Sequence, residues 1–433
     1  MNRDYGEGIA VGGTDVIGEE SLGLSHPMST RDILQKSQTY LLQNYARADL
    51  VLERGNGVYV FDNDGERYLD CVSGLAVNAL GHGDYDVVET IRRQAAHLIH
   101  VSNLYHTIPA ALLAEQLVNR SCADRVFFCN SGTEANEACL KFARRWARAH
   151  YGDEKYELVS TLRSFHGRTM GALSLTGQEK YQAPFEPLLP GVRFAPFNDI
   201  EATLAQVTDR TAAVFLEPVQ AEGGVHLATA EYLKAVREAC DAHHALLVFD
   251  EVQVGLGRTG KLFCYEHYGV EPDMLTLAKP LAAGLPIGAA LLKQHVADAI
   301  RPGDHAATFG GGPLVCAAAL TVLDKLTDGG IVESVARNGE AFGARLRELQ
   351  TRHPVITEVR GLGLIWGVEL AEPGSTFVNE FRKRHVLTCL AGPNVLRFLP
   401  PLVITEDQLH QVVETFDEIL TATSGTQEAP IVP

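Results

Sequence analysis

The chain has 433 residues, 46% of them hydrophobic, and a mean hydropathy of −0.01. This length exceeds one ordinary core, so we expect a globular α/β protein with two packed units. The formal charge of −17 at pH 7 excludes nucleic acid or an anionic membrane as the main partner, because both require a basic face. No apolar run reaches the roughly 18 residues of a spanning helix, so no membrane segment is predicted.

The eight cysteines are scattered and form no CxxC pair. In a chain of this length they indicate reduced thiols and therefore a cytoplasmic protein. The 16 histidines contain no HExxH motif, so we expect no metal site and interpret His166 and His82 as structural.

The N-terminal part predicts a tail followed by short elements. Residues 1–30 are glycine-rich and acidic without a signal-peptide pattern, and we expect a tail or an arm on a partner subunit. Helical spacing covers 30–44, and short strands are predicted within 50–62 and after the turn at Asn63-Asp-Gly65. An amphipathic helix is predicted over 86–97.

From about residue 107 helices and strands alternate. A helix over 110–118 precedes an apolar strand, 125–129, and a long helix, 134–150. Such βαβ repetition predicts a mostly parallel sheet covered by helices on both faces. Further strands are expected at 157–161, 192–196, 212–217, 245–250, 273–278 and 288–292, with a helix over 231–243.

A long helix over 329–350 starts the last part, followed by strands at 364–369 and 396–399 and a helix over 406–421. The predicted large domain is therefore 107–328. Both chain ends, 31–106 and 329–421, build a small α+β domain, and 422–433 is a tail.

Two predicted strands end in residues of opposite charge. Asp250 ends the run from Ala245, and Lys279 ends the run from Met274. Carboxyl ends of parallel strands share one sheet edge, so both side chains can surround one small ligand. This pair suits pyridoxal 5'-phosphate (PLP), since a lysine can carry the cofactor covalently and a carboxylate can keep its pyridine nitrogen protonated.

The turn Asn130-Ser-Gly-Thr133 lies between a strand and a helix. Gly132 permits close approach of an anion, Thr133 adds a hydroxyl, and the helix start offers free N–H groups. An ordinary N-cap is the alternative. The acid and lysine further along the chain favour a phosphate site.

Ser164-Phe-His-Gly-Arg168 follows another strand. Phe165 is a candidate for stacking on the cofactor ring, or a core phenylalanine. Arg168 is a candidate for a substrate carboxylate, or a solvated surface residue.

Arg397 lies in an apolar strand, where a lone charge needs an anionic partner. It is therefore a second candidate for a substrate carboxylate. Glu222, in a glycine-rich loop after a strand, is either a surface acid or the group that pairs with Arg397 in the empty site.

Two glycine-rich segments are rejected as nucleotide loops. Gly255–Lys261 has P-loop spacing, but Leu262 stands where Ser or Thr must hold magnesium. Gly361–Gly367 lacks dinucleotide-loop spacing.

Seven motifs, in order, resemble the class III aminotransferases over about residues 38–420. The resemblance implies PLP fold type I and a homodimer with active sites at the interface. The motifs are Asn130-Ser-Gly-Thr-Glu-Ala-Asn136, Phe165-His-Gly-Arg168, Glu217-Pro-Val-Gln220, Phe249-Asp-Glu-Val-Gln253, Lys279, Thr308-Phe-Gly-Gly311 and Arg360-Gly-Leu-Gly-Leu364.

By position, the resemblance assigns Lys279 as the cofactor lysine and Asp250 as the partner of the pyridinium. Gly132 and Thr133 would hold the phosphate, joined by Thr308 from the other subunit.

The same resemblance stacks Phe165 on one face of the ring and packs Val252 on the other. It counts Glu251 as cofactor-binding and brings Gln253 to the ring hydroxyl.

It further implies that Arg168 and Arg397 bind substrate carboxylates, and that Glu222 gates Arg397.

Within the class, Gly74-Leu-Ala-Val-Asn78, His100–Tyr105 and Arg397-Phe-Leu-Pro-Pro401 are most similar to enzymes that act on N-acetylornithine. The implied reaction moves its terminal amine to 2-oxoglutarate, in arginine biosynthesis. Ala307 departs from the serine usual in those enzymes, and Gly312 from the usual asparagine.

Other readings stay open. They are another ω-amine donor (ornithine, 4-aminobutyrate, succinylornithine or a lysine-pathway amine), a decarboxylase or aminomutase on the same scaffold, and a PLP-dependent regulator. The acidic chain shows no basic helix-turn-helix extension that would favour a regulator.

Overall fold

The computed structural model describes residues 28–424, which fall into two compact units, 28–54 with 61–66, and 55–60 with 67–424. The first unit contains α1 (Thr30–Tyr40), most of β1 (Leu52–Asn56) and the end of β2 (Tyr59–Asp62). Ser29 caps α1 by accepting a hydrogen bond of 3.2 Å from the Asp32 N–H. The expected tail or arm over 1–30 lies almost entirely outside the described residues, and so does most of the expected tail over 422–433.

A seven-stranded sheet forms the centre of the second unit, in the order β4-β12-β11-β10-β7-β5-β6. Only β12 runs antiparallel to its neighbours β11 and β4, so the mostly parallel sheet of the prediction is confirmed. The strands are β4 (Arg125–Cys129), β5 (Glu157–Thr161), β6 (Val192–Ala195), β7 (Thr211–Leu216), β10 (Leu246–Asp250), β11 (Met274–Leu277) and β12 (Gly288–Leu292).

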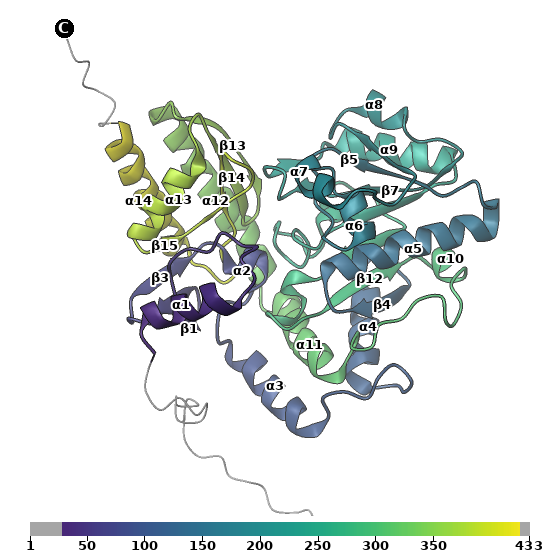
Figure 1. The fold of residues 1–433 in the computed structure, drawn as a ribbon, viewed down its shortest axis with the longest axis horizontal. Coiled ribbons are helices and arrows are strands. Elements are labelled where there is room, and N and C mark those ends of the chain that lie inside the picture. The colour runs from purple at the N-terminus through teal and green to yellow at the C-terminus, as the bar shows by residue number, and fades with distance from the viewer. Residues whose placement is uncertain (1–27, 425–433) are drawn as a thin grey trace, which may run out of the picture. The chain divides into compact units, whose positions relative to one another are not determined.

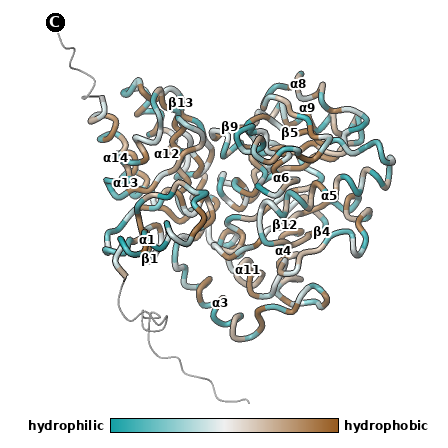
Figure 2. The backbone as a smooth tube through the Cα atoms, viewed as in Figure 1, coloured by the Kyte–Doolittle hydropathy of each residue, from teal (hydrophilic) through white to brown (hydrophobic). Residues whose placement is uncertain are grey.

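Both faces of this sheet are covered by helices, which explains why its strands are continuously apolar (Figure 1). Along β10, Leu247 and Phe249 belong to the core that contains α4 (Ile108–Arg120), α9 (Ala230–Ala242) and α11 (Pro313–Asp328). Leu246 and Val248 belong to a second core with α5 (Gly132–Tyr151). In Figure 2, α3 (Tyr85–His97) and α5 alternate between brown and teal, as expected of helices with one apolar face.

A second sheet, in the order β13-β14-β17-β16, is built from the C-terminal part of the chain. It consists of β13 (Ile356–Leu362), β14 (Ile365–Leu370), β16 (Cys389–Leu390) and β17 (Val395–Phe398), all antiparallel. The helices α12 (Ile331–Arg352), α13 (Gly374–Lys383) and α14 (Glu406–Ser424) accompany it (Figure 1).

The remaining elements are short. They are β3 (Arg67–Asp70), α2 (Ser73–Ala76), α6 (Met170–Leu175), α7 (Glu179–Gln182), α8 (Ile200–Leu204), β8 (Val219–Gln220), β9 (His226–Leu227), α10 (Gln294–Ala297) and β15 (Val386–Leu387).

Several elements differ from the sequence prediction. The helix α1 ends at Tyr40 rather than at residue 44, and α14 continues to Ser424 rather than ending at 421. The 16-residue helix α11 was not predicted, because its many apolar residues give no clear helical period. In the described part of the chain no helix is long and apolar enough to cross a membrane.

The contact between α12 and β14 leaves no room at Gly343. A Cβ atom there would lie 2.0 Å from Cη2 of Trp366. Gly343→Ala should therefore lower the free energy of unfolding by about 1–3 kcal/mol, measured by urea denaturation. Glu340→Ala, at an exposed position of the same helix, should change it by less than about 0.5 kcal/mol. Equal stability of the two variants would contradict this packing.

Candidate active site

The carboxyl ends of the central strands open into one cavity of about 240 Å³. Asp250 ends β10, Lys279 follows β11 in a 3-10 turn (Lys279–Ala282), and Gly132 follows β4. The loop after β5 adds Phe165, and the turn between β8 and β9 adds Glu222. Residues that are far apart in sequence thus meet where open α/β sheets bind ligands.

Four donors hold the carboxylate of Asp250. Oδ2 accepts hydrogen bonds from His166 Nδ1 at 2.8 Å and Asn136 Nδ2 at 2.7 Å. Oδ1 accepts a hydrogen bond from the Val252 N–H at 3.0 Å and shares the one proton of Thr276 Oγ1, 3.3 Å away, with Asn136 Oδ1, which lies 3.1 Å from that hydroxyl. Because each donor comes from a different segment, the carboxylate keeps one orientation as it faces the cavity.

The imidazole of His166 makes one hydrogen bond, between Nδ1 and Asp250, and its Nε2 is buried without a hydrogen-bond partner among the described residues. Asn136, His166 and Thr276 were not among the predicted site residues.

The first turn of α5 forms an anion cradle. Ser131 caps the helix by accepting the Glu134 N–H, which leaves the N–H groups of Gly132 and Thr133 without partners inside the helix. A Cβ atom on Gly132 would lie 2.6 Å from Cγ1 of Val252, so only glycine fits there. Such a cradle suits a phosphate group.

The amine of Lys279 lies in the same cavity. Burial lowers the pKa of Lys279 from its ordinary value, and although Glu222 and Asp250 raise it, the net direction is downward. A larger fraction of neutral amine makes the lysine a better nucleophile and proton acceptor.

Glu222 and Gln253, which line the cavity, form a polar cluster with Arg397. Arg397, on β17 and 1% exposed, donates from Nη1 to Glu222 Oε1 at 2.7 Å and to Gln253 Oε1 at 2.9 Å. Gln253 Nε2 in turn donates to Glu222 Oε1 at 3.1 Å. Burial alone would raise the pKa of Glu222, but Arg397 and Lys279 hold it at about 2. Glu222 is therefore an anion paired with Arg397.

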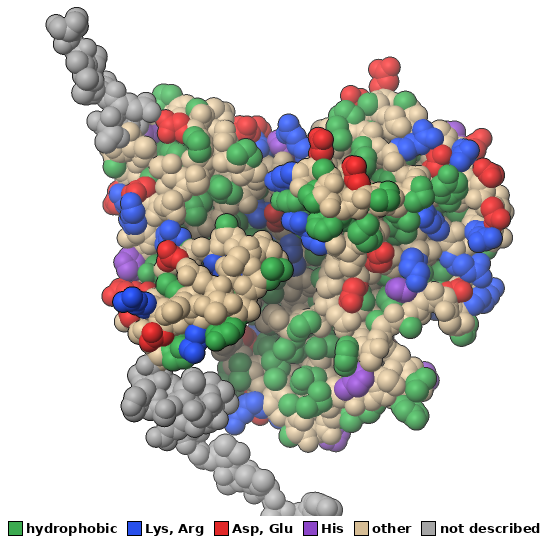
Figure 3. All heavy atoms as spheres, in the orientation of Figure 1, with side chains coloured by type: hydrophobic (Ala, Val, Ile, Leu, Met, Phe, Trp, Pro, Cys, Tyr) green, Lys and Arg blue, Asp and Glu red, His purple; other side chains and the backbone are tan. Residues whose placement is uncertain are grey.

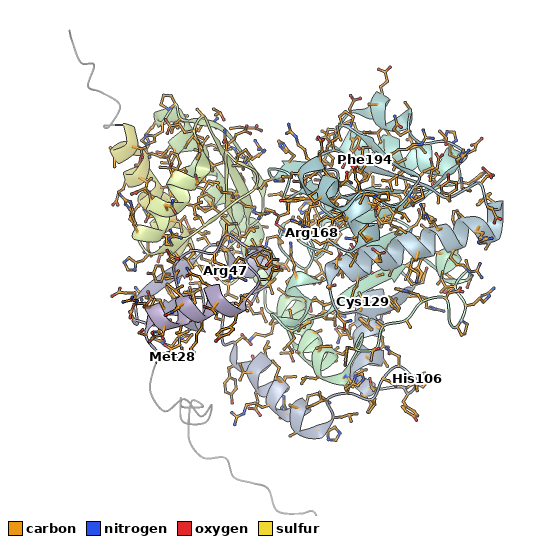
Figure 4. All side chains as sticks on the ribbon, in the orientation of Figure 1. Met28, Arg47, His106, Cys129, Arg168 and Phe194 are labelled. Atoms are coloured by element: carbon orange, nitrogen blue, oxygen red, sulfur yellow. The ribbon has the colours of Figure 1, made fainter. Side chains whose placement is uncertain are left out.

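Phe165 and Arg168 lie together on the loop before α6, where Figure 4 labels Arg168. The Arg168 guanidinium lies 3.8 Å from the ring centroid of Tyr181 and 5.6 Å from that of Phe165. Both Phe165 and the exposed Arg168 line the cavity. Cation–π contacts thus hold a guanidinium at a position that substrates can reach.

Two predicted cofactor-binding residues, Glu251 and Thr308, do not line this cavity. Glu251 turns away from the cavity and accepts the N–H groups of Cys264 and Tyr265, at 2.6 and 2.7 Å. Burial raises the pKa of Glu251 to about 8. Thr308 is exposed and lines a separate depression with Asn103.

Glu217 was passed over in the sequence although it shares the position of Asp250 at a strand end. Its Oε2 accepts the Phe165 N–H at 2.9 Å, and it lines the cavity. Burial raises the pKa of Glu217 well above its usual range. The signal available in the sequence was an acid directly after the apolar run of β7.

The family model "Aminotransferase class-III" matches residues 40–420. The chain belongs to the class III aminotransferases. A relative named acetylornithine aminotransferase, from Methanocaldococcus jannaschii, is 47% identical over 91% of this chain and 99% of its own length. A mitochondrial acetylornithine aminotransferase from Alnus glutinosa is 50% identical over 91% of this chain and 88% of its own length.

Solved structures of class III enzymes agree with the fold. The ornithine aminotransferase of Toxoplasma gondii ME49 has a TM-score of 0.90 at 32% identity, covering 95% of this chain and 99% of its own. The N-acetylornithine aminotransferase of Stenotrophomonas maltophilia K279a has a TM-score of 0.78 at 37% identity, covering 91% and 100%. The fold is therefore PLP fold type I, and the chain is a PLP-dependent transaminase.

The cavity fits this cofactor on its own geometry. The glycine cradle at the start of α5 receives a phosphate, and the fixed Asp250 carboxylate suits a protonated ring nitrogen. Phe165 and Val252 supply apolar walls for an aromatic ring.

Gly132→Ala should weaken PLP binding to the apoprotein by about tenfold or more, because the new methyl group collides with Val252 at the phosphate cradle. Equilibrium titration followed by absorbance measures the affinity. Adding Val252→Ala to this variant restores space and should recover part of the affinity. Unchanged affinity in Gly132→Ala would contradict the cradle.

Proposed function

We propose that the protein transfers the terminal amino group of N2-acetyl-L-ornithine to 2-oxoglutarate, giving N-acetylglutamate 5-semialdehyde and glutamate, a step of arginine biosynthesis. The observation that carries the proposal is that Lys279, Asp250 and Glu222 line one cavity, and that Glu222 is paired with the buried Arg397 at 2.7 Å. Relatives named acetylornithine aminotransferase, 43–50% identical over most of the chain, support this choice of donor.

PLP, when bound, supplies an aldehyde that takes up the amino group and a ring that draws electrons from the reacting carbon. Asp250 would hold a proton at the ring nitrogen, and its four donors keep the carboxylate from turning away. The amine of Lys279 would take a proton from the substrate carbon as base and deliver it as acid to the cofactor carbon that receives the amino group. Its lowered pKa suits that task.

The Glu222–Arg397 pair accounts for two substrates of different charge in one site. An amino donor whose carboxylate binds away from Arg397 leaves Glu222 paired with Arg397. The positive charge of Arg397 is then neutralised and attracts no carboxylate of the donor. 2-Oxoglutarate brings two carboxylates, and we infer that one displaces Glu222 while Arg168 at the rim binds the other. Gln253 would take part in this exchange, since it contacts both members of the pair.

We further propose a homodimer with two shared active sites, in a reducing compartment such as the cytoplasm. All eight cysteines are free thiols, and the segment around α4 exposes a group of large apolar side chains (Figure 3). Asn103 ties this segment to 307–310 by donating to Ala307 O and Gly310 O at 2.9 Å each. A second subunit that covers this surface would bring Thr308 close to the phosphate of the PLP bound in that second subunit. The exposed residues are Leu98, Ile99, Leu104, Tyr105, Ile108, Leu112 and Phe309.

Ornithine is the second candidate donor. Ornithine aminotransferases with TM-scores of 0.83–0.90 and about 30% identity favour it, whereas the higher identity to the acetylornithine enzymes favours the acetylated donor.

An amino-donor panel tests the proposal directly. Glutamate formation from 2-oxoglutarate should be at least about tenfold more efficient, in kcat/KM, with N-acetylornithine than with ornithine or 4-aminobutyrate. Lys279→Ala should lose about 10⁴-fold in kcat because its proton transfers disappear. Lys261→Ala, at an exposed position, should keep wild-type turnover. A preference for ornithine would overturn the choice of donor, and an active Lys279→Ala the mechanism.

A further inference from the structure

The loop from Glu222 to Val225 has a strained backbone. Val225 has φ of 58°, in the left-handed region that β-branched residues rarely adopt, and Gly224 has φ of 121°. Strain of this kind persists only where the surroundings enforce it, and it concentrates at functional sites. Glu222 belongs to this loop, so the contacts that enforce the loop conformation also fix the backbone position of Glu222.

One row of residues across the C-terminal sheet faces this loop. Arg360 on β13 pairs with Gly367 on β14, and Gly367 pairs with Arg397 on β17. Residues directly opposite each other project from the same face of a sheet. The missing side chain of Gly367 leaves space that Val225 fills, because a Cβ atom there would lie 2.9 Å from Cβ of Val225.

The two arginines at the ends of this row hold the loop at two points. Arg397 donates to Ala221 O at 3.0 Å and to the Glu222 carboxylate. Arg360 donates from Nε to Gly224 O at 2.7 Å. The backbone on both sides of Glu222 is therefore attached to one sheet.

The charges around the two arginines differ. Arg360 Nη1 already donates to Glu358 and Glu369, at 2.6 Å each, so its charge is neutralised independently of the loop. Arg397 is paired with Glu222, the pair that the proposed function opens for a substrate carboxylate. In the loop, Arg360 donates only to the main chain, at Gly224 O.

We infer that Arg360 is a positioning residue that fixes the Glu222 loop against the C-terminal sheet and so sets the balance between dicarboxylate and amino-donor binding at Arg397. This inference rests on the proposed function, because it assigns a consequence to the competition between Glu222 and the second substrate. The alternative is that Arg360 only stabilises the β13–β14 pair and leaves substrate preference alone.

Arg360→Lys tests the inference while keeping the positive charge beside Glu358 and Glu369. It loses the Nε–H that reaches Gly224 O, so the loop relaxes and Glu222 competes less well for Arg397. Glutarate, an unreactive dicarboxylate, should bind the holoenzyme about three- to tenfold more tightly by calorimetry. The KM for the amino donor should rise by a similar factor, with kcat nearly unchanged. The control Glu358→Gln keeps the Gly224 contact and should match wild type.

A double-mutant cycle separates positioning from stability. In a Glu222→Gln background no anion competes for Arg397, so Arg360→Lys should no longer alter glutarate affinity. Unchanged glutarate binding in Arg360→Lys alone, or the same change in both backgrounds, would overturn the inference. If glutarate binds wild type and Glu222→Gln equally well, the proposed gate itself fails, and the inference with it. Should Arg360→Lys not fold, Gly224→Ala goes through the same cycle, because its Cβ would lie 2.9 Å from His226 Nε2 and 3.2 Å from Arg360 Nη2 and so disturbs the contact between Arg360 and the loop.

Discussion

The buried carboxylate of Asp250 depends on hydrogen bonds that arrive from three other parts of the chain. An anion in this position, 5% exposed, would cost several kcal/mol if its oxygens were unpaired. Asn136 reaches it from α5, His166 from the loop after β5, and Thr276 from the neighbouring strand β11. These donors can meet only if β4, β5, β10 and β11 keep their order and register, so the site and the sheet specify each other.

The same requirement organises the rest of the cavity. The strand order that brings the donors to Asp250 also brings Lys279 from the end of β11 and the phosphate cradle from the end of β4. Burial then lowers the pKa of the lysine and raises that of Glu217, and Glu222, paired with the buried Arg397, lines the same cavity. A buried carboxylate held by several donors and an amine of lowered pKa together form a site prepared for electron withdrawal and proton transfer.

Much of this architecture could be predicted from the sequence because buried parallel strands are short continuous apolar runs. Asp250, Lys279 and Gly132 were recognised because each directly follows such a run, and Arg397 because a charge inside an apolar strand needs a partner. His166, Asn136 and Thr276 had no such signal, since their role arises from three-dimensional proximity to Asp250. The reversed direction of β12 and the existence of α11 depend on packing rather than on local pattern. Glu217 and Glu251 show where prediction from sequence stops. Each acid directly follows an apolar strand, but Glu217 lines the cavity, whereas Glu251 turns away from it and accepts the Cys264 N–H.

The protonation state of the cofactor ring nitrogen tests the central claim most directly. Holoenzyme loaded with PLP labelled with ¹⁵N in the ring should give, at neutral pH, the nitrogen chemical shift of a protonated pyridinium. Asp250→Asn, which removes the charge and keeps the shape, should shift this resonance toward the unprotonated value. A wild-type ring nitrogen that is unprotonated at neutral pH would contradict the account.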